Sequence, residues 1–129
     1  MNFDRKALIS AAREARENAY APYSDFRVGA AVLCADDTVY TGCNIENASY
    51  SATLCAERCA MAKAISEGKR DFVAIAVAGP PDKITVPCGV CLQFLSEFCG
   101  EETVVLCGGT EENYVLKHLR DLLPQGFKL

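Results

Sequence analysis

Three nearly uninterrupted apolar runs do most to limit how this chain can fold. They are FRVGAAVLC at 26–34, FVAIAVAG at 72–79 and TVVLCG at 103–108. Strands that lack polar alternation are buried on both faces, whereas a half-exposed strand alternates apolar and polar residues. The sequence therefore predicts a sheet that is covered by helices on both sides.

Four segments around these runs have features of helices, such as apolar residues at three- and four-residue spacing. Ser51 or Thr53 is suited to cap the second of them, and Gly68 follows its end. Pro87 stands near the start of the third, and Gly100 follows it. The predicted helices span residues 4–20, 51–69, 87–100 and 115–124.

The predicted order of elements is α-β-β-α-β-α-β-α. The second strand, TVYTGCNI at 38–45, follows the first after the short connection 35–37, which is typical of a hairpin. We expect an α/β fold with this antiparallel hairpin at one edge of the sheet and parallel strands in its second half. Sites in such layers form at helix N-termini beyond the strand ends.

Size and charge restrict the class of protein. A chain of 129 residues suggests one domain, 1–129, and its net charge is −4 without a basic stripe. Nucleic acid is therefore not an expected partner. No apolar run approaches the roughly 20 residues that span a bilayer, and the charged N-terminus lacks the apolar core of a secretory signal. These features predict a cytoplasmic protein that does not bind membranes.

The chain has eight cysteines and one histidine, His118. Thiols stay reduced in the cytoplasm, so we expect small buried side chains or metal ligands rather than disulfides. A zinc site in this chain would have to be rich in thiolate. Four cysteines in or beside apolar segments are predicted to be packing residues: Cys34, Cys43, Cys99 and Cys107.

Cys88 and Cys91 stand one helical turn apart in PCGVC, and Cys55 stands near the start of the preceding helix. Helix N-termini favour thiolates, which makes these three cysteines the best candidate ligands. Three protein ligands leave the fourth position of zinc open, as in catalytic sites. Cys59 could instead complete a structural zinc site, and Cys88 with Cys91 could form a redox pair.

Glu57, in CAE, stands two residues after Cys55. A carboxylate beside an open zinc position can take a proton from bound water and return it to a substrate. Alone, Glu57 would be interpreted as a solvated acid in the first turn of a helix. Together with PCGVC it matches the arrangement of zinc deaminases, in which a glutamate that is not a ligand carries protons.

The chain resembles the small, zinc-dependent cytidine deaminases of pyrimidine salvage, the homotetrameric type within the cytidine and deoxycytidylate deaminase superfamily. Of the matching elements, NIENASY is specific to members that bind nucleosides, whereas the cysteine elements are shared by the whole superfamily. The elements match in order: YAPYSDFRVGAAV, TGCNIENASYS, CAERCA with PCGVC, and LLPQGF.

This resemblance implies a three-layer α/β/α fold with a mixed five-stranded sheet. It implies one Zn²⁺ per subunit, held by Cys55, Cys88 and Cys91. It further implies hydrolysis of cytidine and 2′-deoxycytidine to uridine and 2′-deoxyuridine plus ammonia, with Glu57 as the proton shuttle.

The resemblance also assigns residues to a nucleoside site. Asn44 and Glu46 would hydrogen-bond the ribose, Phe26 would pack against the base, and the Ala56 backbone N–H would bind the base carbonyl. A carboxylate at Glu46 would repel a 3′-phosphate, so a free nucleoside is expected rather than a polynucleotide.

Three more roles follow from the resemblance. Tyr50 and Phe127 would complete the pockets of neighbouring subunits in a homotetramer, and Arg58 would hydrogen-bond the ligating sulfurs. Three thiolates leave zinc with a net charge of −1, which a neighbouring arginine offsets. One departure is Leu92, where many relatives have arginine, and it removes any ion pair that this arginine would make.

Several alternatives to this hypothesis stay open at the level of sequence. The substrate could be another aminated compound: a nucleoside antibiotic, a nucleotide or a base in RNA. A non-catalytic zinc module with Cys59 as fourth ligand and a thiol redox protein are alternatives of a different class. Preference between ribose and deoxyribose is not predicted.

Overall fold

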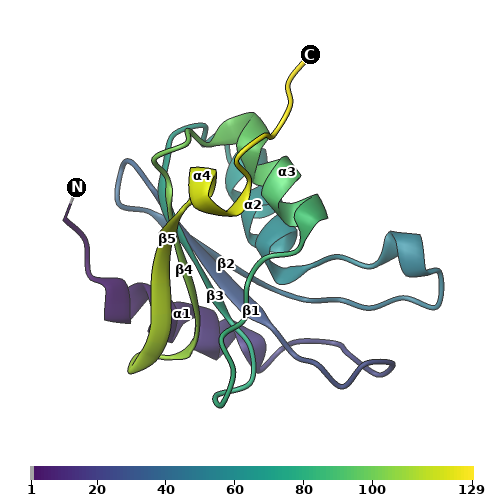
Figure 1. The fold of residues 1–129 in the computed structure, drawn as a ribbon. Coiled ribbons are helices and arrows are strands. Elements are labelled where there is room, and N and C mark those ends of the chain that lie inside the picture. The colour runs from purple at the N-terminus through teal and green to yellow at the C-terminus, as the bar shows by residue number, and fades with distance from the viewer. Residues whose placement is uncertain (1) are drawn as a thin grey trace.

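The computed structural model describes residues 2–129, which form a mixed five-stranded sheet between two helical layers (Figure 1). The strand order is β2-β1-β3-β4-β5. Only β3 and β4 are parallel, and every other neighbouring pair is antiparallel. The strands are β1 (Gly29–Cys34), β2 (Val39–Cys43), β3 (Phe72–Ala78), β4 (Val104–Thr110) and β5 (Asn113–His118). The predicted α/β class, hairpin edge and five-stranded sheet are confirmed.

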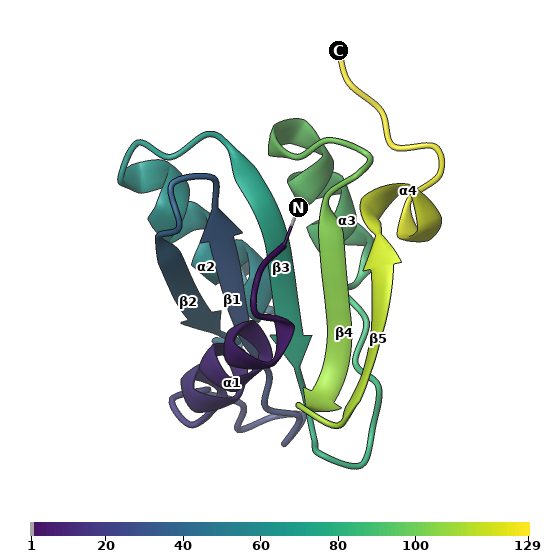
Figure 2. The same ribbon diagram turned by 90° about the vertical axis from the view of Figure 1, so that its left-hand side faces the viewer.

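The helix α1 (Arg5–Arg16) lies across one face of the sheet (Figure 2). Its buried residues include Leu8 and Ile9, which pack against small side chains of the central strands. A Cβ atom at Gly29 would lie 1.9 Å from the carbonyl oxygen of Ala12, so this close approach of helix and strand requires glycine. The helix ends at Arg16, earlier than predicted.

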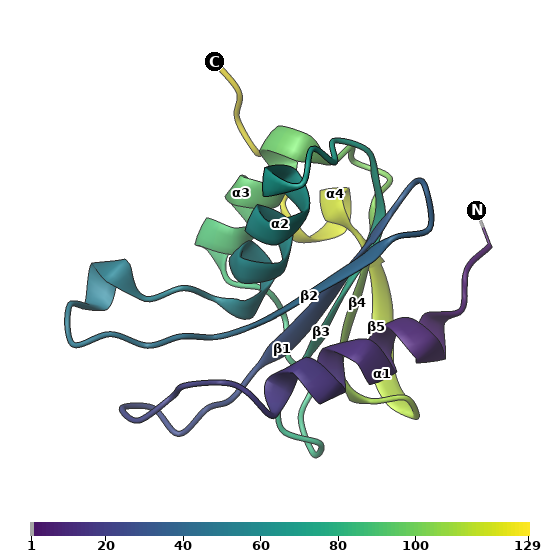
Figure 3. The same cartoon turned by 180° about the vertical axis from the view of Figure 1, so that it is seen from behind.

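The opposite face is covered by α2 (Ala56–Ser66), α3 (Gly89–Phe98) and the short α4 (Leu119–Leu122) (Figure 3). Met61 and Leu95 are buried between these helices and the sheet. The N-caps of α2 and α3 are Cys55 and Cys88, so two candidate ligands begin the two helices.

The prediction that Ser51 or Thr53 caps α2 was wrong. Residues Tyr50–Ala52 form a separate 3-10 turn, and Leu54 then exchanges backbone hydrogen bonds of 2.9 Å with Ile45. This bridge keeps the backbone extended until Cys55.

The predicted last helix, 115–124, was also wrong in its first half. Asn113–His118 is the edge strand β5, in which exposed residues alternate with partly buried ones. Tyr114 and Leu116 pack against the cluster beneath α1, and Val115 is exposed. Pairing with β4 therefore outweighs the helical spacing of the apolar residues, and α4 is a single turn.

Two loops, 17–28 and 44–55, extend together beyond the sheet on the side where β1 begins and β2 ends (Figures 1 and 3). Tyr20 connects them through two backbone hydrogen bonds, with Asn44 at 3.0 Å and Glu46 at 2.8 Å. Within residues 2–129, none of the helices has the length and apolar character needed to cross a membrane.

Candidate metal centre and substrate site

The three predicted cysteine ligands come together where α2 and α3 begin. The Sγ atoms of Cys55, Cys88 and Cys91 all lie within 4.8 Å of one another, and those of Cys55 and Cys88 are 3.9 Å apart. Tetrahedral zinc with Zn–S bonds of about 2.3 Å would place two sulfurs about 3.8 Å apart. The donor set and its spacing therefore fit zinc with one position left for water.

Cys59, the rival fourth ligand, is not part of this cluster. It is one turn further along α2 and lies against Gly42 of β2. The alternative of a four-cysteine structural site therefore has no fourth thiol at the cluster. All eight cysteines, which lie within the described residues, are free thiols.

Hydrogen bonding to the charged form lowers the pKa of the Cys55 thiol. The Cys91 thiol and then the Arg58 guanidinium lower the pKa of Cys55 to about 5. The pKa of Cys91 is raised because its proton is held by Cys55 and because its thiol is buried. The Cys91 thiol thus donates to the Cys55 thiolate, and a metal ion that bound the thiolates would displace this proton.

Glu57 is buried, with 4% of its surface exposed, in the first turn of α2. The interpretation as a solvated acid is therefore wrong. Burial raises the pKa of its carboxyl to about 7. A carboxyl group with a pKa near neutrality can both accept and donate a proton, which is what a proton shuttle requires.

Arg58 provides positive charge beside the thiols. Its Nη2 atom lies 3.5 Å from Cys55 Sγ and 3.3 Å from the carbonyl oxygen of Thr53. The neighbouring thiolate raises the pKa of Arg58 further above its ordinary value, so the guanidinium stays charged. The buried Nε atom has no hydrogen-bond partner among residues 2–129.

Asn44 is placed at the end of β2, where its side chain holds the loop before β1. Its Nδ2 donates to the Phe26 carbonyl oxygen at 2.8 Å, and its Oδ1 accepts from the Val28 N–H at 2.9 Å. An amide has two donor hydrogens and two acceptor lone pairs. One of each is therefore left for a ligand such as a sugar hydroxyl.

Glu46 lies two residues further along the same loop. Its Oε1 accepts from the backbone N–H groups of Tyr23 at 2.9 Å and Ser24 at 3.1 Å, and its Oε2 accepts from the Ser24 hydroxyl. These bonds, led by that of the hydroxyl, lower the pKa of Glu46. The carboxylate is thus charged at neutral pH and fixed in orientation.

The two residues predicted to contact the base lie close to the core. Phe26 is partly buried and packs against the core cluster beneath α2 and α3, with the Lys83 ammonium 5.7 Å from its ring centroid. Ala56 is fully buried as the first residue of α2. The backbone N–H of a first helical residue has no partner within the helix, so it is available to a ligand.

The two aromatic residues predicted to act across subunits are exposed. Tyr50 is 79% and Phe127 is 67% exposed. The Tyr50 ring makes an edge contact with Tyr23, at 6.5 Å between centroids. The side-chain amide of Gln93 forms two hydrogen bonds with the backbone of Phe127. Its Nε2 donates to the Phe127 carbonyl oxygen at 2.8 Å, and its Oε1 accepts from the Phe127 N–H at 3.3 Å.

Comparison with known proteins agrees with this geometry. The family profile of the cytidine and deoxycytidylate deaminase zinc-binding region matches residues 2–107. The cytidine deaminase of Halalkalibacterium halodurans is 49% identical over 124 residues, which cover 96% of this chain and 94% of that protein. The chain belongs to the cytidine and deoxycytidylate deaminase family.

Solved structures of deaminases share the fold as well as the sequence. The cytidine deaminase from Burkholderia pseudomallei is 43% identical with a TM-score of 0.92, over 97% of this chain and all (100%) of that chain. The cytidine deaminase from Mycobacterium tuberculosis is 39% identical with a TM-score of 0.86, over 99% of this chain and 100% of that one. The predicted resemblance, the fold class and the zinc-binding character are confirmed.

An apolar groove of about 650 Å³ lies beside the metal centre of this deaminase, between α2, α3 and the C-terminal tail. Leu54, Val90 and Phe127 line it, and each has more than two fifths of its surface exposed, with 41% the smallest value. A second groove, of about 520 Å³, adjoins it on α2 and shares Leu54 and Arg58.

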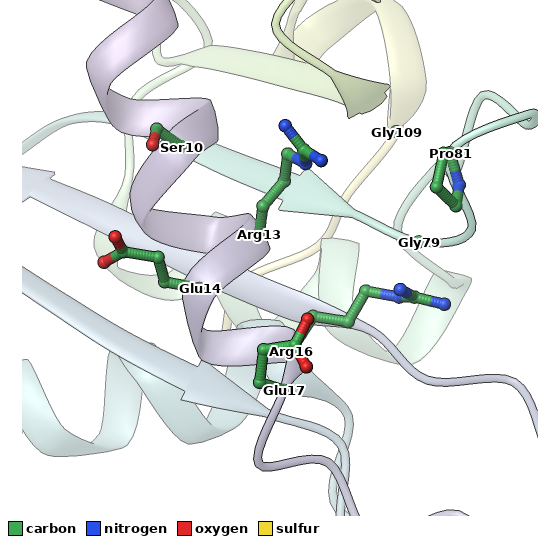
Figure 4. Close-up of a pocket in the computed structure, with 8 residues that line it drawn as sticks. All are labelled: Ser10, Arg13, Glu14, Arg16, Glu17, Gly79, Pro81 and Gly109. Atoms are coloured by element: carbon green, nitrogen blue, oxygen red, sulfur yellow. The ribbon is translucent and has the colours of Figure 1, made fainter.

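A different hollow lies on the α1 side of the sheet, beside Gly79, Pro81 and Gly109 (Figure 4). Its two arginines already have partners within the chain. Arg13 forms a bidentate ion pair with Glu111 at 2.9 and 2.8 Å, and Arg16 Nε donates to the Arg27 carbonyl oxygen at 2.8 Å. None of the predicted site residues lines this hollow.

Two residues of the site were not predicted from the sequence, Ser24 and Gln93. Both act on the main chain or on a side chain of another loop, and such contacts depend on loop conformation. Ser24 stands inside the matching element YAPYSDFRVGAAV, which was the one signal that could have drawn attention to it.

Proposed function

We propose that this protein is a zinc-dependent hydrolase that converts cytidine and 2′-deoxycytidine to uridine and 2′-deoxyuridine with release of ammonia. The observation that carries this proposal is the position of Glu57, buried two residues from Cys55 at a cluster of three thiols. The relatives named cytidine deaminase align over nearly the whole chain, which supports the same substrate class.

Cys55, Cys88 and Cys91 would hold one zinc ion. When bound, zinc supplies an acidified water at its open position. The Glu57 carboxylate would accept one proton from the water whose oxygen bonds to C4 of the base, and would deliver that proton to N3. It would then pass the second proton of the water to the amino group, which leaves as the C4–N bond breaks. One water molecule is consumed and one ammonia molecule leaves, and Glu57 ends in its starting state.

The nucleoside is held by groups outside the metal centre. Phe26 packs against the base, and the Ala56 N–H donates to the base carbonyl. Asn44 and Glu46 hydrogen-bond the sugar hydroxyls. Because the Glu46 carboxylate is charged, it repels a phosphate on the 3′-oxygen, which favours a free nucleoside over a nucleic acid.

We propose a homotetramer in which Tyr50 and Phe127 complete the pockets of neighbouring subunits. The support is the exposure of both rings and the apolar groove that Phe127 and Leu54 line beside the metal centre. A second copy of the chain that covered this surface would remove exposed apolar area from water. Each subunit would then act as one deaminase domain that spans 1–129.

The proposed setting is pyrimidine salvage in the cytoplasm. The eight free thiols support a reducing compartment, since three of them must be available as thiolates for the metal. Oxidation of Cys88 with Cys91 would remove two of the three ligands.

The test is a substrate panel followed by ultraviolet absorbance, with zinc-loaded protein and each candidate at equal concentration. The panel contains cytidine, 2′-deoxycytidine, cytidine 5′-monophosphate, adenosine and a cytidine-containing oligoribonucleotide. We expect conversion of the first two and little or none of the others. Rapid conversion of the nucleotide or the oligoribonucleotide, with cytidine inert, would move the assignment to another substrate of the same family.

A further inference from the structure

The hydroxyl of Ser24 lies between two residues that are proposed to bind different parts of the nucleoside. Its Oγ accepts from the Phe26 backbone N–H at 3.0 Å and donates to Oε2 of Glu46. Phe26 is the proposed base-packing residue, and Glu46 is the proposed sugar-binding residue. One exposed serine therefore connects both halves of the proposed binding site.

Ser24 also fixes a carboxylate that has few other constraints. Backbone N–H groups of Tyr23 and Ser24 hold Oε1 of Glu46, whereas Oε2 accepts only from the Ser24 hydroxyl among the hydrogen bonds formed by residues 2–129. Without that hydroxyl, Oε2 would have no hydrogen bond to residues 2–129, and the tilt of the carboxylate would be set by the two bonds to Oε1 alone. The Phe26 N–H would also lose its acceptor.

The turn that carries Ser24 has an unusual backbone. Asp25, the next residue, has a φ of 57°, which non-glycine residues adopt infrequently. The Asp25 N–H donates to the Ala21 carbonyl oxygen at 3.0 Å, which closes the turn. A turn of this kind persists where surrounding contacts hold it, and the Glu46 carboxylate supplies three of them.

We propose that Ser24 is a positioning residue that orients the Glu46 carboxylate toward the 3′-hydroxyl of the sugar and so determines selectivity for nucleosides that carry it. This inference rests on the proposed function, because it assigns Glu46 to the sugar. Ser24 itself need not touch the substrate. Its effect is to remove the rotational freedom that Glu46 would otherwise lose on binding.

The experiment compares two variants of equal shape, Ser24→Thr and Ser24→Val, of which only the threonine keeps a hydroxyl. The exposed position of Ser24 leaves room for either side chain. The readout is kcat/KM for cytidine divided by kcat/KM for 3′-deoxycytidine. Glu46→Ala, assayed alongside, reports the ratio without the carboxylate, and Ser10→Ala on the opposite face is the unaffected control.

We expect Ser24→Val to lower this ratio about five- to tenfold, through a higher KM for cytidine with kcat changed less than about twofold. The KM for 3′-deoxycytidine should rise less, because this substrate lacks the hydroxyl that Glu46 would bind and is affected only through the lost acceptor of the Phe26 N–H. Ser24→Thr should keep most of the wild-type ratio. Zinc content and thermal unfolding, measured for both variants, separate this effect from loss of the fold.

Equal ratios for Ser24→Thr and Ser24→Val would overturn the inference, since the two side chains differ in the hydroxyl. If Glu46→Ala lowers the ratio and Ser24→Val does not, Glu46 binds the sugar without help from Ser24, and Ser24 has no positioning role. If the wild type converts neither cytidine nor 3′-deoxycytidine, the proposed function itself fails and the inference fails with it.

Discussion

The metal centre of this deaminase and its proposed sugar side, the loops 17–28 and 44–55, are built in different ways. Cys55 and Cys88 cap two helices whose other faces form the core, and Cys91 and Glu57 are buried at 0% and 4% exposure. The loops 17–28 and 44–55 extend past the sheet and are held by a few backbone hydrogen bonds and by the side chains of Asn44 and Glu46. Tyr50, on the second loop, is 79% exposed.

This difference divides the groups that would carry out the reaction from the groups that would bind the sugar. The groups that would carry protons and metal are fixed by packed secondary structure, which tolerates little displacement. The groups that would hold the sugar depend on a few hydrogen bonds and, in our proposal, on a second copy of the chain. Changes at the metal centre should therefore abolish the rate, and changes on the sugar side should act on KM.

The largest effect is expected for Cys91→Ala. Loss of one of three ligands should release zinc and lower activity by about 10⁴-fold or more, since metal catalysis contributes several kcal/mol to barrier lowering. Zinc per chain, measured by atomic absorption, should fall in parallel. Cys99→Ala, which removes a buried thiol outside the cluster, should keep its zinc. A variant Cys91→Ala that stayed active and zinc-bound would refute the ligand set.

The next largest effect is expected for Glu57→Gln. The amide keeps the shape but cannot carry a proton, so kcat should fall about 10²- to 10⁴-fold. Zinc content should stay at the wild-type value, because Glu57 is not a ligand in our account. Steady-state assays with cytidine check the rate. A rise in KM alone, with kcat unchanged, would show that Glu57 only binds substrate.

A smaller effect is expected for Phe127→Ala in the C-terminal tail, which the proposal places at the pocket of a neighbouring subunit. Loss of an aromatic contact with the nucleoside should raise KM about tenfold with zinc content unchanged. If the ring acts across subunits, the variant should also bind its neighbours less tightly, which sedimentation at several concentrations would detect. An unchanged KM would remove Phe127 from the binding site.

The smallest effect is expected for Gln93→Ala, which releases the tail from α3. KM should rise about two- to fivefold, since the two hydrogen bonds only position Phe127. In the double variant with Phe127→Ala, the effect of Gln93→Ala should disappear, because its target is gone. Additive effects of the two changes would mean that Gln93 acts elsewhere.

The metal centre could be predicted from the sequence because the spacing of its cysteines along the chain determines how they lie on a helix. Cys88 and Cys91 share one helical turn whatever the surrounding structure, and Cys55 has a counterpart position on the other helix. The burial of Glu57 was not predictable from local sequence, since acids in a first helical turn are usually solvated.

The errors in the fold arose where tertiary pairing overrides local preference. Val115, Leu116 and Leu119 have helical spacing, yet β4 offered an unpaired edge and the first two became part of β5. Ser51 and Thr53 are good capping residues, but the bridge between Ile45 and Leu54 delays the helix. In the two loops, Asn44 and Glu46 bind main-chain groups and, for Glu46, the Ser24 hydroxyl as well, and no residue pattern encodes these partners.

The most direct test of the central claim is a zinc titration of metal-free protein, with uridine and ammonia measured at each step. We predict that activity on cytidine rises in proportion to bound zinc, reaches its maximum at one zinc per chain, and yields equal amounts of both products. Glu57→Gln should bind the same single zinc and stay nearly inert. Activity in the absence of zinc, or full activity in zinc-loaded Glu57→Gln, would contradict the account.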